Sequence, residues 1–414
     1  DGDHLKELGG DGAVSWEKIK LSNCCISIAD GDHQPPPKSK DGIPFVTIAN
    51  IENNQFDFTN AMFVPKDYYE KLDDKRKPQK DDILYSVVGS FGIPVLIKND
   101  KHFVFQRHIA ILRPNKSIDA RFLYYTMLSR DFYMKADAAA IGAAQRTVSL
   151  TALRNIQITV PPIETQHRIA NILSAYDDLT ENNRKQIKLL EEAAQRLYKE
   201  WFVNLRFPGY EHTKITDGVP EGWKIDLLSN IVKTTSGGTP ARSHPEYYIN
   251  GSTLWVKTQE LLDAFILDTE EKITDEAITN SSTKLVSKGS ILMAMYGSTI
   301  GKLGIASQDL TCNQACCVFD VSGFKYGGMY LFCWLFENRK FLIKLGKGVA
   351  QSNLSQTMIK NLNILIPDMN VLHQFSCIVD SLYSEILANQ KRITILSEAR
   401  DRLLPKLMSG EVEV

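Results

Sequence analysis

The sequence predicts an α+β protein made of two similar halves, each a strand-rich globular domain followed by one long helix. Three observations predict this fold: an internal repeat, short β-like runs bounded by turn residues, and two long stretches with apolar residues at helical spacing. We place the globular domains at 1–160 and 208–366 and the helices at 161–207 and 367–414. The helices are expected to pack as an antiparallel coiled coil, which gives the chain a pseudo-two-fold internal repeat.

The repeat can be read directly from the sequence. Residues 142–173 read GAAQRTVSLTALRNIQITVPPIETQHRIANIL, and residues 348–379 read GVAQSNLSQTMIKNLNILIPDMNVLHQFSCIV. At this shift of 206 positions (348 − 142) the alignment runs without a gap to 203 and 409, and 18 of 62 pairs are identical, several times the chance level. The shift is close to half of the 414 residues, so the repeat unit is half the protein. Such a chain suits a target that also comes in two halves.

The two globular regions show the same order of elements. In the first, about 14–160, the β-like runs are IPFVTIANI (43–51), DILYSVVGSFGIPVLI (82–97) and HFVFQRHIAILRP (102–114), and the helical stretch ARFLYYTMLSRDFYMKA (120–136) follows. In the second, about 216–366, the corresponding runs are STLWVKTQEL (252–261), GSILMAMYGSTIGKLGIAS (289–307) and CNQACCVFDV (312–321). Trp16 matches Trp223, and Gly89-Ser90 matches Gly297-Ser298. The halves keep one plan but differ in detail, as expected either of different specificities on one scaffold or of neutral drift.

Each long helix is predicted by an apolar stripe. The first helix follows Pro161-Pro162 and runs from about Glu164 to Val203. Its stripe consists of Ile169, Ile172, Tyr176, Leu179, Ile187, Leu190, Ala194, Leu197 and Trp201. The stripe of the second helix consists of Phe375, Ile378, Leu382, Asn389, Ile393, Leu396, Leu403 and Leu407, with Glu385 and Arg400 as polar exceptions. A helix of about 40 residues is about 60 Å long and cannot bury its stripe on a small domain alone, so we expect the stripes to pack on each other.

Both stripes carry an asparagine at the matching place, Asn183 and Asn389. If the helices pack antiparallel, their midpoints meet, and Asn183 lies close to the midpoint of its helix. One hypothesis is that the two asparagines face each other and fix the register, at a cost in stability relative to an apolar pair. The alternative is that each asparagine lies on a solvated edge.

The composition is that of a globular protein with substantial cores: 43% of residues are hydrophobic and 23% are charged. No apolar run reaches the length of a membrane span, so we expect no membrane partner. The seven cysteines form no CxxC pair, which disfavours a zinc site and favours buried, reduced thiols in a cytoplasmic protein. The net charge of −1 counts against a stand-alone nucleic-acid binder, so local basic patches or basic partners would have to neutralise DNA phosphates.

Sequence motifs of catalysis are absent. None of GxSxG, HExxH, GxGxxG or the Asn-Pro-Pro-aromatic segment of an adenine methyltransferase occurs. The segment GSTIGKL (297–303) looks faintly like a phosphate-binding loop but lacks its first Gly and the Ser or Thr after Lys. We therefore expect a non-catalytic chain with no metal site.

Polar loops in the repeat suggest binding instead of catalysis. GAAQRTVS and GVAQSNLS place a glutamine and small polar side chains just before a strand, and an amide side chain can donate and accept at once, as readout of adenine requires. The first candidates for DNA binding are Gln145, Arg146, Gln351, Ser352 and Asn353. Second candidates are Gln106, Arg107, His108, Arg242, Lys257, Lys302, Asn313 and Gln314. The alternative for any one of them is a surface polar residue or a turn former.

Three segments carry a resemblance to a known family. PPIETQHRIANILSAYDDLTENNRKQIKLLEEAAQRLYKEWF (161–202) resembles the central conserved region of type I restriction–modification specificity (S) subunits, the HsdS family. RDRLLPKLMSGEVEV (400–414) is similar to the C-terminal conserved region of that family, and VPEGWKIDLLSNI (219–231) to the opening of its second target-recognition domain. The order of segments matches over essentially the whole chain. In the second repeat copy, IPDMNVLHQF departs from the Pro-Pro…Gln pattern, which weakens the helix start there.

The resemblance implies that each globular half is a target-recognition domain that reads a few base pairs through the major groove of double-stranded DNA. The central and C-terminal conserved helices would act as a ruler between two half-sites, so that the target is bipartite, asymmetric and interrupted by a non-specific spacer. The family does not identify the base-contacting residues, because these domains diverge with what they read.

The resemblance also implies partners. Two modification (M) subunits would dock on the helices and recognition domains, bring S-adenosylmethionine and methylate adenine N6, for which the adenine must flip out of the stack. Restriction (R) subunits would add ATP- and Mg²⁺-dependent translocation and cleavage. The S subunit would hold none of these cofactors and would be cytoplasmic in a prokaryote. The rival interpretations are a coiled-coil scaffold that binds only proteins, and a nuclease with an unrecognised site.

Overall fold

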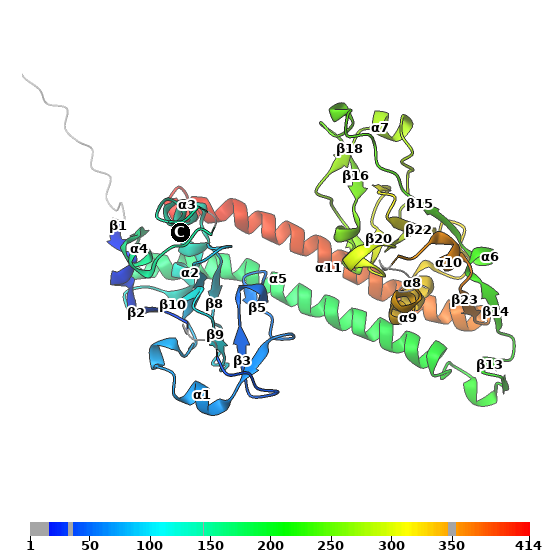
Figure 1. Cartoon of the computed structure of the whole chain (residues 1–414), viewed down its shortest axis with the longest axis horizontal. Coiled ribbons are helices and arrows are strands. Elements are labelled where there is room, and N and C mark those ends of the chain that lie inside the picture. Colours follow the sequence, from blue (N-terminus) through cyan, green and yellow to red (C-terminus); the bar gives the residue numbers. More distant parts are fainter. Residues whose placement is uncertain (1–15, 32–35, 144, 347–352) are drawn as a thin grey trace, which may run out of the picture. The chain divides into compact units, whose positions relative to one another are not determined.

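The computed structural model describes residues 16–31, 36–143, 145–346 and 353–414 (Figure 1). The chain divides into two compact units. The first unit comprises Asp1–Leu179 with Leu396–Val414, and the second comprises Thr180–Ile395. Each unit therefore combines one globular region with one segment of each long helix.

The main sheet of the first unit has four antiparallel strands in the order β2-β10-β7-β8. These strands are β2 (Cys25–Asp30), β7 (Ile83–Ser86), β8 (Pro94–Leu96) and β10 (Ile109–Pro114). Alternate residues of a strand point to opposite faces of the sheet. Accordingly, Ile83 and Tyr85 enter one apolar core while Leu84 and Ile111 enter another. Burial on both faces explains why β7 and the first four residues of β10 are almost entirely apolar in sequence.

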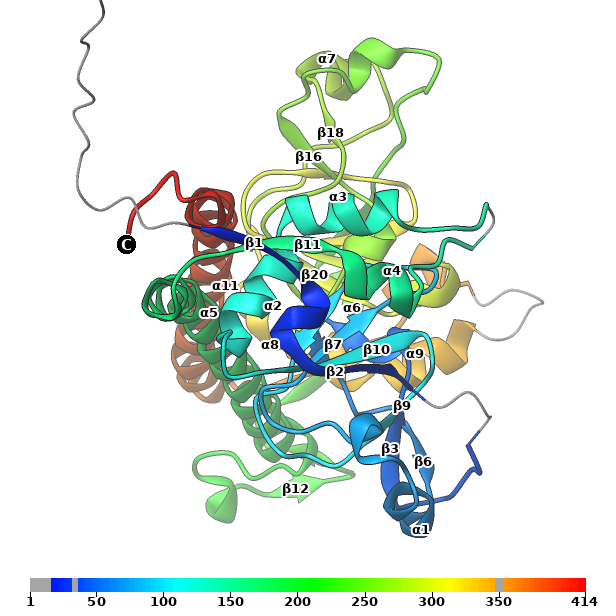
Figure 2. The ribbon, with the colours of Figure 1, turned by 90° about the vertical axis from the view of Figure 1, so that its left-hand side faces the viewer.

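A second, smaller sheet of three strands has the order β6-β3-β9, in which β3 and β9 are parallel. The bounds of the remaining strands of this unit are β1 (Glu17–Lys20), β3 (Ile43–Val46), β4 (Ile51–Glu52), β5 (Gln55–Phe56), β6 (Met62–Val64), β9 (Val104–Phe105) and β11 (Gln157–Val160). Strand β1 pairs with β11 and so joins the start of the globular region to its end, as Figure 2 shows.

The short helices of the first unit are α1 (Lys66–Glu70), α2 (Ala120–Leu128), α3 (Arg130–Ala138) and α4 (Leu150–Asn155). The single helical stretch expected at 120–136 is two helices. Ser129 interrupts it, because its extended backbone ends α2 and its hydroxyl accepts a hydrogen bond from the Phe132 backbone N–H at 3.3 Å, which caps α3.

The second unit repeats the plan. Its main sheet has the order β15-β22-β19-β20-β17, and its smaller sheet has the order β18-β16-β21. Strand β14 pairs with β23 as β1 pairs with β11. The bounds of the strands are β12 (Ile215–Thr216), β13 (Val219–Pro220), β14 (Lys224–Leu227), β15 (Lys233–Ser236), β16 (Thr253–Val256), β17 (Ala264–Ile266), β18 (Lys272–Ile273), β19 (Ile291–Ala294), β20 (Leu303–Ala306), β21 (Thr311–Cys312), β22 (Cys316–Asp320) and β23 (Asn363–Ile366). The short helices are α6 (Leu228–Ile231), α7 (Asp275–Thr279), α8 (Gly328–Glu337), α9 (Arg339–Leu345) and α10 (Gln356–Lys360).

The long helices are α5 (Ile163–Tyr198), which continues as a π-helical turn at Lys199–Val203, and α11 (Met369–Ser409). Within the second unit, Trp201 lies against Phe375 with ring centroids 6.0 Å apart, and Gln195 lies beside Tyr383. Higher residue numbers in α5 and its π-helical turn thus lie beside lower residue numbers in α11, so the two segments run antiparallel. In the first unit, the two helices share one core with α2, and Arg400 of α11 contacts Asp177 of α5.

The buried face of each helix agrees with the predicted stripe at Ile169, Ala194, Phe375 and Leu407 and is displaced by one residue at other positions. The half-buried members of the stripe are Ile172, Tyr176, Ile187, Leu190, Leu197, Trp201, Leu382, Ile393, Leu396 and Leu403. Ile378, expected in the packed stripe, is 46% exposed. The fully packed positions in the second unit are Ala194, Tyr198, Phe202, Phe375, Val379, Tyr383 and Ile386. These residues share their core with α8, so the most buried face points between the partner helix and the globular region.

Asn183 and Asn389 are both buried, with 7% and 0% of their surface exposed, which excludes the solvated edge. The Oδ1 atom of Asn389 accepts a hydrogen bond from Arg392 at 2.8 Å, while its Nδ2 atom has no acceptor among the described residues. A reciprocal amide pair, in which each asparagine donates to the other, is therefore not formed. That the two residues fix the register stays a prediction.

Candidate nucleic-acid interface

In the first unit, the segment that follows β7 brings most of the candidate residues together. The Val87 N–H donates to the His108 carbonyl at 2.9 Å, and the Val87 carbonyl accepts from the Val148 N–H at 2.9 Å. The Gly89 N–H donates to the Arg146 carbonyl at 3.0 Å. Residues 87–89 thus lie between the loop that carries Gln106, Arg107 and His108 and the segment that carries Gln145 and Arg146.

The turn after this segment is held in a fixed shape. The buried hydroxyl of Ser86 donates to the Ser90 carbonyl and accepts from the Ile93 N–H, both at 2.9 Å. Gly92 has a φ of +96°, and a Cβ there would come within 2.6 Å of the Tyr133 ring. That ring stacks on Phe91 with centroids 5.6 Å apart and an interplanar angle of 7°. The turn beside the candidate loops is therefore held in one conformation.

The second unit builds the same junction from different side chains. The Met295 N–H donates to the Ala315 carbonyl and the Met295 carbonyl accepts from the Leu354 N–H, both at 2.9 Å. The β-bridge between Tyr296 and Asn353 corresponds to the bridge between Val88 and Thr147. Asn353 lies 206 positions after Thr147 (353 − 147), the shift of the sequence repeat. Gln351 and Ser352, the other candidates of this loop, lie outside the described residues.

The amide candidates divide into those already engaged and those still available. Asn313 uses its Oδ1 atom to accept from the Ala315 N–H at 3.1 Å, which is the turn-forming alternative. Gln314 accepts a hydrogen bond from the Thr239 hydroxyl. Within the described residues, no hydrogen bond engages the side chains of Gln106, Gln145 or Asn353. These three amides keep both their donors and their acceptor for a ligand.

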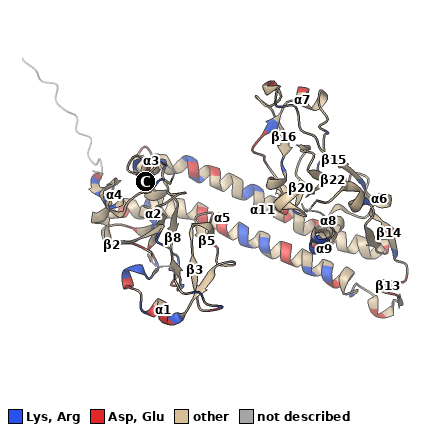
Figure 3. Ribbon diagram, viewed as in Figure 1, with Lys and Arg blue, Asp and Glu red and all other residues tan. Residues whose placement is uncertain are grey.

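The basic candidates are mostly paired with carboxylates. Arg146 pairs with Asp137, and Lys302 pairs with Asp263 at 3.1 Å. Asp263 is also held by Arg339. Arg107 is exposed, and the ion pairs of the described residues do not include it. In the ribbon of Figure 3, positions of Lys and Arg (blue) and of Asp and Glu (red) are interspersed along α5 and α11, so neither helix shows a long run of one sign.

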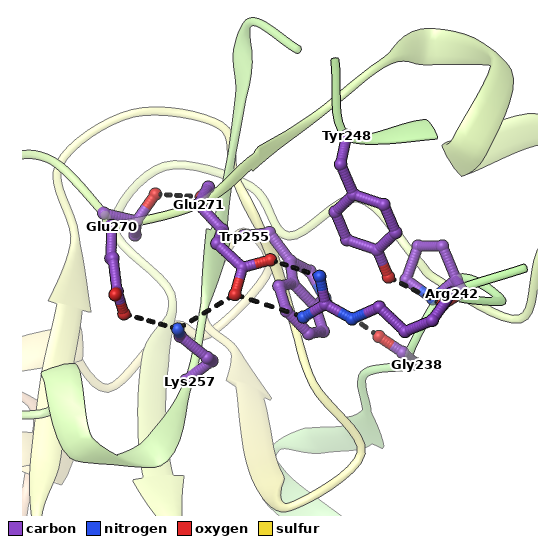
Figure 4. Close-up of polar contacts among 9 residues, drawn as sticks. Gly238, Arg242, Tyr248, Trp255, Lys257, Glu270 and Glu271 are labelled. Carbon is purple, nitrogen blue, oxygen red and sulfur yellow. Dashed lines mark hydrogen bonds and ion pairs between the residues drawn. The ribbon is translucent and has the colours of Figure 1, made fainter. Parts of the chain in front are cut away.

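Arg242 and Lys257 belong to a compact cluster beside β16 and β18 (Figure 4). The Arg242 guanidinium donates to both carboxylate oxygens of Glu271, at 2.6 and 3.1 Å. The Lys257 ammonium donates to Glu271 at 3.1 Å and to Glu270 at 2.6 Å. The hydrogen bond from Arg242 is the largest cause that lowers the pKa of Glu271, so the carboxylate is ionised at neutral pH.

Two aromatic rings fix the position of this guanidinium. The Arg242 Cζ atom lies 4.2 Å from the Tyr248 ring centroid and 5.3 Å from that of Trp255. Tyr248 donates to the Pro240 carbonyl at 2.6 Å, and Trp255 donates to the Gly238 carbonyl at 3.0 Å. Both rings are therefore tied to the loop that carries Arg242. This cluster adjoins the candidate loop of the unit, because the Asn313 N–H donates to the Val256 carbonyl at 2.9 Å.

The sequence analysis proposed Arg242 and Lys257 as candidates but did not indicate their partners Glu270, Glu271 and Tyr248. Glu271 is 29 positions from Arg242, and no local pattern links them. The same holds for Asp177, whose carboxylate accepts from Arg400 at 2.7 Å and from the Tyr125 hydroxyl at 2.8 Å. Arg400, a polar exception in the predicted stripe, thus pairs with a mostly buried carboxylate.

No group of three or more His, Cys, Asp or Glu in the described ranges of the chain is arranged to hold a metal ion. No helix in the same ranges is long and apolar enough to cross a membrane.

Comparison with known proteins identifies the family. The chain is 28% identical over 412 residues to the type I restriction enzyme MjaIX specificity subunit of Methanocaldococcus jannaschii, covering 96% of this chain and 94% of that protein. It is 22% identical over 442 residues to the HindI specificity subunit of Haemophilus influenzae, covering 89% and 94%. The fold matches the S subunit of the type I restriction–modification system of M. genitalium with a TM-score of 0.60 at 17% identity, covering 97% of this chain and 98% of that one.

The match to the family model is repeated as the fold is repeated. Residues 14–192 and 220–397 each match the type I restriction modification DNA specificity domain. Together these ranges span both globular regions and most of both long helices. The chain therefore belongs to the family of type I restriction–modification specificity subunits.

Proposed function

We propose that this chain is the DNA-recognition subunit of a type I restriction–modification complex and is not itself an enzyme. It binds a bipartite, asymmetric target in double-stranded DNA, with one half-site for each unit and a non-specific spacer between them. The observation that supports this most strongly is the recurrence of one junction, Val87–Val148 in the first unit and Met295–Leu354 in the second, with different side chains around it. One scaffold used twice with different side chains suits two different half-sites.

The partners follow from the same proposal. Two modification subunits bind this chain, bring S-adenosylmethionine and methylate adenine N6 in each half-site, and restriction subunits supply ATP- and Mg²⁺-dependent cleavage. The charge pattern supports a divided interface. Because Arg146, Arg242, Lys257 and Lys302 are already paired with carboxylates, these four candidates offer little net charge to phosphates. The modification subunits then provide much of the phosphate contact.

The test is genome-wide mapping of N6-methyladenine in a host that expresses this chain with its cognate modification subunit, against the modification subunit alone. A bipartite methylated motif that occurs only with this chain supports the proposal and reveals target and spacer together. If an active, assembled complex adds no methylation to the control, the protein-only scaffold replaces it. Mg²⁺-dependent DNA cleavage by the purified chain alone would contradict the non-enzymatic role.

A further inference from the structure

We propose that Arg242 recognises a guanine in the half-site bound by the second unit, and that Glu271 is the residue that positions it. This inference rests on the proposed function and specifies one of its contacts. Of the cationic candidates described above, Arg242 combines three features that base recognition needs: a fixed orientation, spare donors and an exposed side chain.

The orientation is fixed before DNA arrives. The guanidinium plane is bounded by the Tyr248 and Trp255 rings and by the carboxylate of Glu271, and both rings are anchored on the backbone of the same loop. An arginine that is free in solution loses rotamer freedom on binding, whereas one that is held beforehand does not. The residue therefore meets the groove with little further ordering.

Spare donors remain after this anchoring. A guanidinium has five N–H groups in a planar fork, and Glu271 takes one from each terminal nitrogen. The edge formed by Nε and one terminal nitrogen keeps two parallel N–H groups. Guanine presents O6 and N7, two adjacent acceptors, in the major groove, and arginine is their usual partner. The Arg242 side chain as a whole is 57% exposed, which leaves it accessible to a ligand.

The charges around Arg242 favour a base over a phosphate. Arg242 and Lys257 are balanced by Glu270 and Glu271, and the Glu260 carboxylate accepts from the Lys257 and Glu270 N–H groups, so the cluster carries no net positive charge. A cluster without net positive charge has little long-range attraction for phosphates. The Lys257 side chain is 17% exposed and its ammonium is shared between both carboxylates. Lys257 therefore neutralises Glu271 rather than contacting DNA, a narrower role than the sequence suggested.

The first unit has a threonine, Thr47, at the position that Lys257 occupies in the second unit. The Gln106 N–H donates to the Val46 carbonyl there, as the Asn313 N–H donates to the Val256 carbonyl in the second unit. The residue after Val46 is Thr47, whose N–H is capped by Asn50 at 2.9 Å, and the residue after Val256 is Lys257, whose N–H is capped by Glu260 at 2.7 Å. The two units share this scaffold, but the first unit has no lysine at the position of Lys257, so we assign the guanine contact to the half-site of the second unit.

The experiment uses the full chain with its modification subunit and compares methylation of all single-base variants of the target. The variants are Arg242→Lys, which keeps the charge but loses the fork, Arg242→Gln, and Glu271→Gln, which frees the fork. The control is Arg206→Gln, because Arg206 is also an exposed arginine paired with a carboxylate, Glu200 at 3.4 Å. Circular dichroism establishes that each variant is folded.

We expect both Arg242 variants to lose about 10- to 100-fold of the preference for G·C at one position of one half-site, with all other positions unchanged. Glu271→Gln should weaken the same position less, and the control should keep the parental motif. A uniform loss over all sequences with a shallower salt dependence would make Arg242 a phosphate contact and overturn the inference. Unchanged preference at every position would overturn it too. If the parental complex itself shows no motif, the proposed function fails, and the inference with it.

Discussion

The contact between Arg400, Asp177 and Tyr125 allows a quantitative test of how the C-terminal helix is held in the first unit. The side chains of Arg400 and Asp177 are 23% and 20% exposed, and the pair is reinforced by the Tyr125 hydroxyl. Burial is the largest cause that raises the pKa of Tyr125, and the neighbouring Asp177 raises it further, so the phenol stays protonated and donates. The carboxylate thus has two donors in a largely dry place.

Arg400→Met removes one of these donors and leaves a mostly buried carboxylate with Tyr125 alone. Breaking a fully buried pair costs about 3–5 kcal/mol and breaking an exposed one costs about 0–1 kcal/mol. With about a fifth of each side chain exposed, we expect about 2–3 kcal/mol. Since 1.4 kcal/mol is tenfold, hydrogen exchange of the amides in 396–409 should accelerate about 30- to 150-fold.

A triple variant separates the lost ion pair from general damage. Tyr125→Phe with Asp177→Leu and Arg400→Met replaces the whole set by apolar side chains of similar size, which is expected to return exchange to within about tenfold of the parent. The second unit supports this expectation, because Tyr383 and Ala194 occupy the positions matched to Asp177 and Arg400 by the 206-residue shift. Arg402→Met is the control, since its partner Glu398 and Arg402 itself are 60% and 82% exposed. Parental exchange rates in the single variant, or equal damage in the triple variant, would refute the reasoning.

Three further predictions concern stability and the spacer. Burial, with smaller contributions from Asp263 and Glu192, raises the pKa of Glu191 from 4.5 to about 7. As the pH rises, the unfolded chain therefore releases this proton before the folded chain does. The stability of the second unit should fall as pH rises from about 4.5 to 7 and level off above. Urea unfolding of Glu191→Gln should show a shallower fall over that window, and an identical pH profile would contradict the shift. Gly92→Ala should destabilise the first unit by about 1–3 kcal/mol, because it adds a collision with Tyr133 to the strain of a positive φ. Gly209→Ala, at a φ of +89° with nothing within 4 Å, measures the strain alone, and equal losses in thermal unfolding would disprove the collision. Deleting seven residues from each long helix removes about 10 Å of helix. This deletion should shorten the methylated spacer by about three base pairs and leave both half-sites unchanged. Methylation mapping that shows altered half-site bases would contradict the hypothesis that the helices set the spacer length.

Much of the fold could be predicted from the sequence because the two halves of the sequence repeat one pattern. The repeat, the proline-bounded helix starts and the apolar runs at β7 and β10 specify elements that depend on local pattern. The buried face of the helices was less well predicted, and Ile378 is exposed while its neighbour Val379 is buried. A stripe in sequence indicates the direction of one partner, whereas each helix here packs against both a helix and a globular region.

The candidate residues were chosen by residue type, and the sequence did not reveal which groups they would pair with. Gln106, Gln145 and Asn353 were candidates because amide side chains can donate and accept, and no hydrogen bond of the described residues engages their side chains; that they contact DNA stays a prediction. The pairing of Arg242 with Glu271 could not be predicted, because it depends on how two strands of the small sheet place side chains 29 positions apart. Whether a cation is free for DNA is decided by such pairings, which the number of charges in a sequence does not reveal.

The junctions at Val87 and Met295 have an evolutionary consequence. Each candidate loop is attached to its sheet by main-chain hydrogen bonds, and a main-chain bond is indifferent to the side chain beside it. Substitutions at positions such as Gln145 or Asn353 can therefore change the exposed side chains while the fold persists. Under the proposed function, new target sequences become reachable by single steps, each compatible with the same partners. Variation among related chains should then concentrate in these loops, while β7, β10, β19 and β22 stay nearly constant.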